Sequence, residues 1–96
     1  ADIAPDLGRY IVSFAFGEIY HRPALNNRER ELLTLGLLAA QGGCEKQLKV
    51  HIHAALNVGI SREEIVEAFI HAVPYLGFPK ALNAVFVAKE VFAESK

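Results

Sequence analysis

The sequence predicts a small all-α domain of about five helices. Apolar residues recur every three or four positions along nearly the whole chain, which is the spacing of one helix face. No segment alternates apolar and polar residues as a half-buried strand does. Glycine and proline separate the periodic segments and end one helix before the next begins. The 96 residues correspond to one domain, residues 1–96.

The first helix is expected from about Pro5 to Tyr20. Pro5 suits a first helical position, because the N–H that proline lacks has no partner there. Arg22-Pro23 should end the helix, since a residue before proline avoids the helical conformation. Its apolar positions include Leu7, Ile11, Phe14, Ala15 and Ile19.

The second and third helices are separated by Gly42-Gly43. We expect the second to run from a cap at Asn26 or Asn27 to about Gln41, with the acid Glu29 in its first turn. The third should span about Cys44 to Val58, with Gly59 as its left-handed terminator.

The fourth helix begins with the clearest local signal in the chain. Ser61-Arg-Glu-Glu64 is a capping box, with Ser61 as the cap and Glu64 three residues later. The helix should continue to about Leu76, although Pro74 is expected to kink it or end it early. The last helix should run from Pro79 to about Glu94, and the short connections predict antiparallel hairpins.

The composition predicts an assembly of several copies. Hydrophobic residues make up 52% of the chain, yet a chain this short has little interior of its own. Burial between subunits would account for the surplus. No apolar run reaches the roughly 18–20 residues of a membrane span. The 10 basic and 11 acidic residues form no basic cluster. We therefore expect a homo-oligomer, with neither a membrane nor a nucleic acid as partner.

Cysteine usage favours the cytoplasm. The single cysteine, Cys44, excludes a disulfide within the chain and fits a reducing compartment. Residues 1–5 show neither the basic start nor the apolar core of a secretory leader. The chain is also compatible with a start inside a longer gene product.

The third predicted helix carries the candidate site. Cys44, Gln47 and His51 are spaced i, i+3 and i+7 and therefore form one stripe. Leu48 and Ile52 lie on the neighbouring core-facing strip, so His51 should lie at the edge of apolar packing. Position alone favours a histidine that packs there and bonds to a nearby carbonyl or carboxylate.

A metal site in this helix is not expected. His53 points about 200° away from His51, and no Cys or His stands three or four residues from His51. His21 and His71 are isolated, and we interpret them as surface or packing residues.

Cys44 and the charged residues before the second apolar segment each allow two interpretations. Cys44 stands near a helix N-terminus, which favours a reactive thiol, although a buried inert cysteine is the commoner case.

Charged residues like those from Arg28 to Glu31 usually form a solvated face. Because Arg30 and Glu31 adjoin apolar positions, one of them can turn inward. A buried Glu31 would need a partner, and His51 is the candidate.

Four segments match, in order, the pattern of a known family. They are Phe16-Gly-Glu-Ile-Tyr-His-Arg-Pro23, then Arg30-Glu-Leu-Leu-Thr34, then Leu48-Lys-Val-His-Ile-His-Ala-Ala55 with Asn57 and Gly59, and finally Tyr75-Leu-Gly-Phe-Pro79 with Ala81-Leu-Asn83. They resemble the γ-carboxymuconolactone decarboxylases, with His51 on the family histidine, and the likeness extends over essentially the whole chain. The resemblance implies an alkylhydroperoxidase D-like helical hairpin bundle.

The wider superfamily contains alkylhydroperoxidase D-like proteins, whose centre reads C-x-x-C-x-x-x-H after a glutamate on the preceding helix. Cys44 falls on the first cysteine, His51 on the histidine and Glu31 near the glutamate. Gln47 replaces the second cysteine, which breaks the thiol relay of that branch. The chain also departs from the decarboxylases, which usually have a glutamate at Gln47, an arginine at His53 and a small polar residue at Glu31.

The resemblance implies cofactor-free decarboxylation of 4-carboxymuconolactone or a related small anionic lactone, in aromatic-acid catabolism. His51 would be the acid/base or the donor to an enolate-like oxygen, and Glu31 would orient it. Arg30, with Lys49 or Arg22, would hold the substrate's carboxylates, and Gln47 would line the same site. The resemblance also implies a homo-oligomer, either a trimer or a hexamer.

Two other functions stay open. A thiol peroxidase would use Cys44 with His51 as its base. A non-catalytic oligomeric binding module would need no cavity beside His51. The sequence fixes neither the substrate nor the branch of the superfamily.

Overall fold

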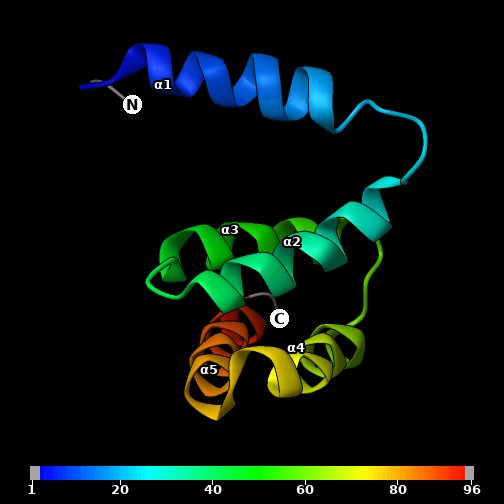
Figure 1. Cartoon of the computed structure of the whole chain (residues 1–96), viewed down its shortest axis with the longest axis vertical. Coiled ribbons are helices and arrows are strands. Elements are labelled where there is room, and N and C mark those ends of the chain that lie inside the picture. Colours follow the sequence, from blue (N-terminus) through cyan, green and yellow to red (C-terminus); the bar gives the residue numbers. More distant parts are fainter. Residues whose placement is uncertain (1–2, 95–96) are drawn as a thin grey trace.

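The computed structural model describes residues 3–94, which contain helices and no strand. This confirms the predicted all-α class. Figure 1 shows an N-terminal helical arm above a body of four helices. The body consists of α2 (Asn27–Gln41), α3 (Glu45–Asn57), α4 (Arg62–Leu76) and α5 (Phe78–Glu94).

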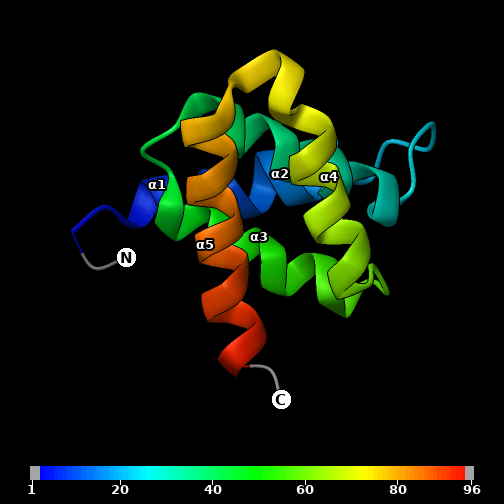
Figure 2. The same cartoon turned by 90° about the horizontal axis from the view of Figure 1, so that it is seen from below.

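Two helical hairpins make up the body. α2 packs against α3, α4 packs against α5, and the hairpins meet through α2 with α4 and α3 with α5 (Figure 2). Each helix turns an apolar stripe toward this common interior, as its periodicity predicts. The largest fully buried side chains are Leu35, Ile52, Ile60, Ile65, Phe69 and Val91.

Capping boxes begin both α2 and α4. The side chain of Asn26 accepts from the Glu29 backbone N–H, while the Glu29 carboxylate accepts from the Asn26 backbone N–H, at 2.8 and 2.9 Å. Ser61 and Glu64 make the same reciprocal pair at 3.0 and 2.8 Å, as predicted. These bonds satisfy backbone N–H groups that a helix start leaves free.

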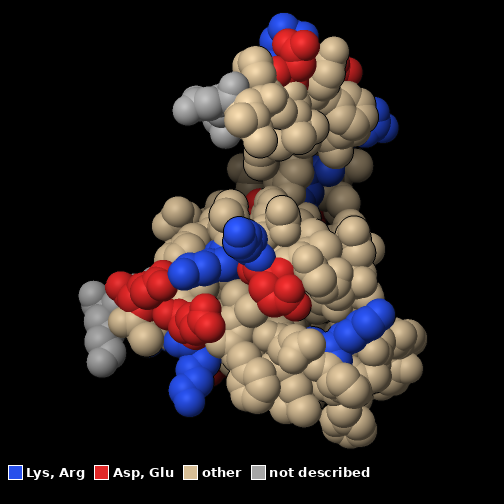
Figure 3. All heavy atoms as spheres, turned by 90° about the vertical axis from the view of Figure 1, so that its left-hand side faces the viewer, with Lys and Arg blue, Asp and Glu red and all other residues tan. Residues whose placement is uncertain are grey.

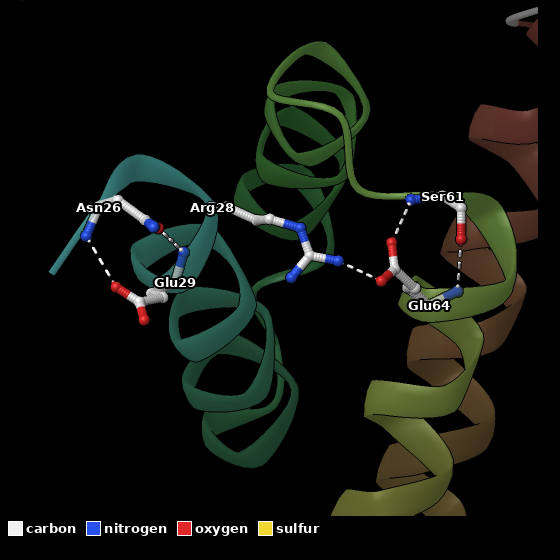
Figure 4. A network of polar contacts seen from close by, with 5 residues as sticks. All are labelled: Asn26, Arg28, Glu29, Ser61 and Glu64. Carbon is white, nitrogen blue, oxygen red and sulfur yellow. Dashed lines mark hydrogen bonds and ion pairs between the residues drawn. The ribbon is translucent and has the colours of Figure 1, made fainter.

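The two capped helix starts are joined by an ion pair. The Arg28 guanidinium bonds to the Glu64 carboxylate, so a residue of the first turn of α2 holds the capping glutamate of α4 (Figure 4). The start of α2, which leads to the candidate site, is thereby fixed against the second hairpin.

The helices of the body begin and end within a residue or two of the predicted positions. Gly42 and Gly77 follow α2 and α4 with φ of 73° and 88°, a conformation that favours glycine. Pro74 does not end α4 early, because the helix continues to Leu76. The helix lacks the one hydrogen bond that a backbone N–H at this position would have donated, and the proline side chain is exposed.

The arm differs from the expected single α-helix. It begins as α1 (Pro5–Tyr10) and continues as η1 (Ile11–Ile19), a π-helix in which each N–H bonds five residues back. The wider turn brings residues four or five apart, instead of three or four apart, to the same side of the helix. No residue of either segment is buried. The helical part of the arm ends at Ile19, before Arg22-Pro23, where the sequence predicted its end.

The body positions the candidate site on the α2–α3 hairpin, close to where the arm joins. No helix within residues 3–94 has the length and apolar character needed to cross a membrane.

Candidate functional site

A buried glutamate and a half-buried histidine form the centre of the candidate site. Glu31 Oε1 and His51 Nδ1 lie 2.9 Å apart, and their side chains are 7% and 19% exposed. Glu31 lies on the inner side of α2 with Leu35 and Ala39, one and two turns further along. The sequence-based expectation that Glu31 turns inward toward His51 therefore matches the geometry.

The contact accounts for the burial of a charged group. A carboxylate out of water needs hydrogen bonds, and the imidazole N–H supplies one. With Nδ1 donating to Glu31, the ring orientation is fixed and Nε2 is left for chemistry. The pair thus has the arrangement of an acid–base group and its orienting carboxylate.

A second polar contact lies one turn further along α2. The Tyr20 hydroxyl and Thr34 Oγ1 are 3.0 Å apart, and Thr34 Oγ1 also donates to the Arg30 carbonyl at 2.8 Å. Since residues three apart share a helix side, Thr34 and Glu31 lie on the same side of α2. Tyr20 therefore reaches down to the face that carries His51, and its ring contacts that of Phe16 at 5.0 Å.

Tyr20 and Thr34 were not singled out as site residues from the sequence. Both stand inside segments that resemble the family pattern, which was the available signal. A tyrosine and a threonine fourteen residues apart carry no charge or spacing that would pair them in advance.

Cys44 occupies the position before α3 and makes no capping hydrogen bond with its side chain. Its thiol donates instead to the Gly42 carbonyl at 3.4 Å. Seven residues of helix place it about 10 Å from His51 along the axis. Gln47 is exposed, one turn before His51.

Two of the three cations predicted to hold the substrate, Arg22 and Arg30, lie at the root of the arm. Arg30 donates to the Leu25 and Arg22 carbonyls at 3.1 and 2.7 Å, so its guanidinium holds the loop at the root of the arm. The Arg22 side chain is exposed in that loop.

Lys49 belongs to another surface. It pairs with Glu94 of α5 at 2.8 Å, and this hydrogen bond raises the pKa of Lys49. Residues two apart on a helix point in nearly opposite directions, so Lys49 faces away from His51. Within one subunit, Lys49 is thus turned away from His51, and a role for it in holding a substrate stays a prediction. It lines a separate hollow of about 510 Å³ between α3 and α5.

The other histidines are peripheral. His53 Nε2 lies 3.4 Å from the Glu94 carboxylate, on the far side of α3 from His51. His21 Nδ1 contacts the Gly17 carbonyl at 3.1 Å, and His71 lies beside Tyr75. Within residues 3–94, no three His, Cys, Asp or Glu side chains gather in a way that could hold a metal ion.

His51 lines none of the five surface hollows that we located in the described part of the chain. An apolar hollow of about 680 Å³ lies instead between α2 and α4. None of these five hollows therefore reaches the Glu31–His51 pair of the single subunit.

Comparison with known proteins decides the family. The sequence profile of the carboxymuconolactone decarboxylase family matches residues 5–90. The chain belongs to the carboxymuconolactone decarboxylase family. A 4-carboxymuconolactone decarboxylase from Acinetobacter baylyi is 36% identical over 93 residues, which are 97% of this chain and 69% of the relative.

The chain is also similar to two further relatives. A protein of Metarhizium robertsii named nitrosuccinic acid decarboxylase is 38% identical over 80 residues, or 83% of this chain and 55% of the relative. An uncharacterized 15.0 kDa protein of Paracoccus denitrificans is 30% identical over 93 residues, with 96% and 69% coverage. This member of the carboxymuconolactone decarboxylase family thus spans only part of the length of each relative.

Proposed function

We propose that the protein is a cofactor-free decarboxylase of small anionic substrates, with His51 as its acid–base group. The observation that carries the proposal is the 2.9 Å contact between His51 and the buried Glu31, in a chain of this family. A carboxylate buried in apolar surroundings is costly, and its use as the orienting partner of a reactive histidine accounts for it.

The substrate chemistry explains why no cofactor is needed. When the C–CO2 bond of 4-carboxymuconolactone breaks, the electron pair moves into the conjugated system toward the lactone carbonyl. CO2 leaves, and a proton must then reach carbon to give the enol-lactone. The enzyme has to seat the carboxylates, stabilise the enolate-like oxygen and supply that proton.

His51 is assigned the last two tasks. Its Nε2–H, when the ring is protonated, stabilises negative oxygen or delivers the proton to carbon, while Glu31 balances the charge on the ring. Arg22 and Arg30, at the root of the arm, are the cations assigned to the carboxylates, and Gln47 is assigned to the wall one turn from His51.

The relatives' names suggest a shared substrate class. Nitrosuccinic acid, like the carboxylactone, is a small dicarboxylic acid in which an electron-accepting group can take the pair left by CO2. We therefore propose a substrate with two carboxylates, one of them on a carbon activated by a carbonyl or nitro group, and place 4-carboxymuconolactone first. The setting is aromatic-acid catabolism in the cytoplasm, and the working form is a homo-oligomer, a trimer or hexamer.

The peroxidase alternative has less support from the geometry. A thiol that uses His51 as its base must lie within hydrogen-bond reach of the ring, whereas Cys44 lies about two turns away along α3. Its thiol donates instead to a backbone carbonyl.

A substrate panel tests the proposal. The purified full chain is incubated with 4-carboxymuconolactone, nitrosuccinate and, separately, an organic hydroperoxide with a thiol reductant, and CO2 release and peroxide loss are followed. We expect CO2 release from at least one dicarboxylate and the same rate after Cys44→Ser. Peroxide consumption that Cys44→Ser abolishes, with no CO2 release, would replace the decarboxylase by the redox function.

A further inference from the structure

The N-terminal arm, residues 5–20, exposes many large apolar side chains to solvent. Seven large apolar side chains of α1 and η1 are between 38% and 67% exposed. Isolated helices of this length are marginal in water, because most helical stability comes from packing an apolar face. The seven are Leu7, Tyr10, Ile11, Val12, Phe14, Phe16 and Ile19.

The arm does not find a partner surface in its own chain. Neither α1 nor η1 packs against any helix of the body within the described residues. Figure 3 shows the arm as a separate mass above the body, with mostly uncharged atoms on the side in view. The contacts that hold it are polar and lie at its root, from Tyr20 to Thr34 and from Arg30 to the Arg22 carbonyl.

An apolar groove of matching character lies on the other side of α2. This α2–α4 groove has a volume of about 680 Å³. Its small residues Gly36, Ala40, Ala68 and Ala72 allow a helix to approach closely. Large side chains stand beside them, and Leu33, Leu37 and Tyr75 are 55%, 60% and 81% exposed.

The arm cannot reach the groove of its own chain without breaking its root. Thr34, which holds Tyr20, lies on the Glu31 side of α2 and is not among the groove residues. Arg30 fixes the loop between arm and helix by two backbone carbonyls. The groove is therefore available to the arm of another molecule.

We infer that the arm of one copy packs into the α2–α4 groove of a second copy. Seven side chains of this size, each about half exposed, offer about 600 Å² per arm, and roughly half of this area lies on any one side of the arm. With a similar area from the groove, one contact buries about 600 Å², and the two contacts of a reciprocal pair of copies bury about 1,200 Å², which enters the range of roughly 1,200–2,000 Å² found in stable interfaces. The same two surfaces on every copy allow a closed assembly.

The inference deepens the homo-oligomer of the proposed function by naming its surfaces. It also bears on the site. Because the arm is rooted one turn of α2 from Glu31, a copy that holds the arm is brought near the half-buried His51. The second copy is thus in position to contribute to the surroundings of the site.

The test measures the mass of the full chain by sedimentation and light scattering without substrate, so its result does not depend on decarboxylation. Phe14→Glu changes the arm and Leu37→Glu changes the groove, and both side chains are exposed within the subunit. Ile70→Glu is the matched control, because Ile70 is equally exposed on α4 but lines a different apolar hollow, toward α5.

We expect the wild type and Ile70→Glu to be oligomers, and the dissociation constant of Phe14→Glu and Leu37→Glu to rise at least tenfold. A wild-type monomer at micromolar concentration overturns the inference together with the proposed oligomer. An oligomer that Ile70→Glu dissociates, or that both Phe14→Glu and Leu37→Glu leave intact, overturns the inference alone.

A cross-link identifies the contact directly. In a Cys44→Ser background, chains carrying Phe14→Cys are mixed with chains carrying Leu37→Cys and oxidised. A covalent dimer of the two chains is expected. Its absence, while Phe14→Cys links instead to Ile70→Cys, places the arm in the other hollow and contradicts the inference.

Discussion

At the scale of single residues, the chemistry depends on how Glu31 holds His51. The contact was predictable because Glu31 stands among apolar positions of α2, and a buried carboxylate requires a partner. His51 was the titratable residue on the edge of the next helix. Helical spacing and the cost of burying charge left Arg30 or Glu31 as the residue that turns inward, and they made His51 the candidate partner of Glu31.

Other residues of the face escaped prediction for a physical reason. Tyr20 and Thr34 are uncharged, and neither is costly to expose, so nothing in the sequence required them to meet. Lys49 was assigned to the site on its charge, although its two-residue offset from His51 already placed it on the opposite side of α3.

Glu31→Gln tests the orienting role. The amide keeps the shape and can still accept the Nδ1–H bond, but it removes the charge that stabilises a protonated ring. Since hydrogen bonds to charged groups exceed neutral ones by about 1–2 kcal/mol, we expect kcat for decarboxylation to fall about tenfold with little change in KM. Glu31→Asp should recover part of the loss. A change confined to thermal stability, with kcat intact, would leave Glu31 a purely structural residue.

Arg22→Gln and Lys49→Gln form a matched pair that locates the substrate's carboxylates. Loss of one charge-assisted hydrogen bond at Arg22 should raise KM about tenfold. Lys49→Gln should change kcat/KM less than twofold, because its ammonium pairs with Glu94 on the other side of α3. Steady-state kinetics of both variants measure these effects. A large effect of Lys49→Gln with little effect of Arg22→Gln would place the substrate's carboxylates near α5.

At the scale of helices, the sequence predicted starts better than helical type. The cap at Asn26 or Asn27 and the capping box at Ser61 were predictable because a cap is local and involves residues that are three apart. The π-helix of the arm has no such local signal: the apolar spacing of residues 11–19 suits bonding to the fourth or to the fifth residue. Pro74 was judged by its residue type, whereas its position two residues before the end of α4 makes it tolerable.

The start of α4 gives a stability prediction with a pH dependence. Loss of the cap in Ser61→Ala should cost about 1 kcal/mol, or roughly 4–8 °C in Tm for a domain of this size. The Ser61 backbone N–H, and after it Arg28, lower the pKa of Glu64 below its ordinary value. Glu64 therefore stabilises the fold above the pKa of the unfolded chain, and this contribution is lost as pH falls through the lower folded pKa.

Thermal melts from pH 7 down to pH 3 measure this contribution. The wild type should lose more stability across that range than Glu64→Gln, whose side chain does not titrate. Parallel curves for the two proteins would show that Glu64 contributes nothing to the acid sensitivity of the fold.

At the scale of the whole molecule, the composition predicted more apolar residues than one subunit can bury. The single subunit indeed leaves many large apolar side chains exposed. The body buries a core between its hairpins, and large apolar side chains are left exposed on the arm, in the α2–α4 groove and elsewhere on the body, as at Ile70, Phe78 and Phe86. Where they would be covered could not be predicted, because it depends on surfaces that only the folded chain brings into place.

Stability should depend on protein concentration if subunit contacts cover these surfaces. Assembly stabilises the folded chain by mass action, so Tm should rise by several degrees over a hundredfold increase in concentration. Calorimetry at micromolar and sub-millimolar chain concentrations measures the shift. An invariant Tm would mean that the folded subunit is stable alone and that the arm contributes no assembly energy in this range.

The central claim is that His51, held by Glu31, carries out decarboxylation. The most direct measurement is the rate of CO2 release from 4-carboxymuconolactone by the wild type and by His51→Gln, with circular dichroism to verify that both are folded. A positioned acid–base group contributes about 10²–10⁴-fold, so kcat/KM should fall by that factor in His51→Gln. A folded His51→Gln protein that releases CO2 at the wild-type rate would contradict the account.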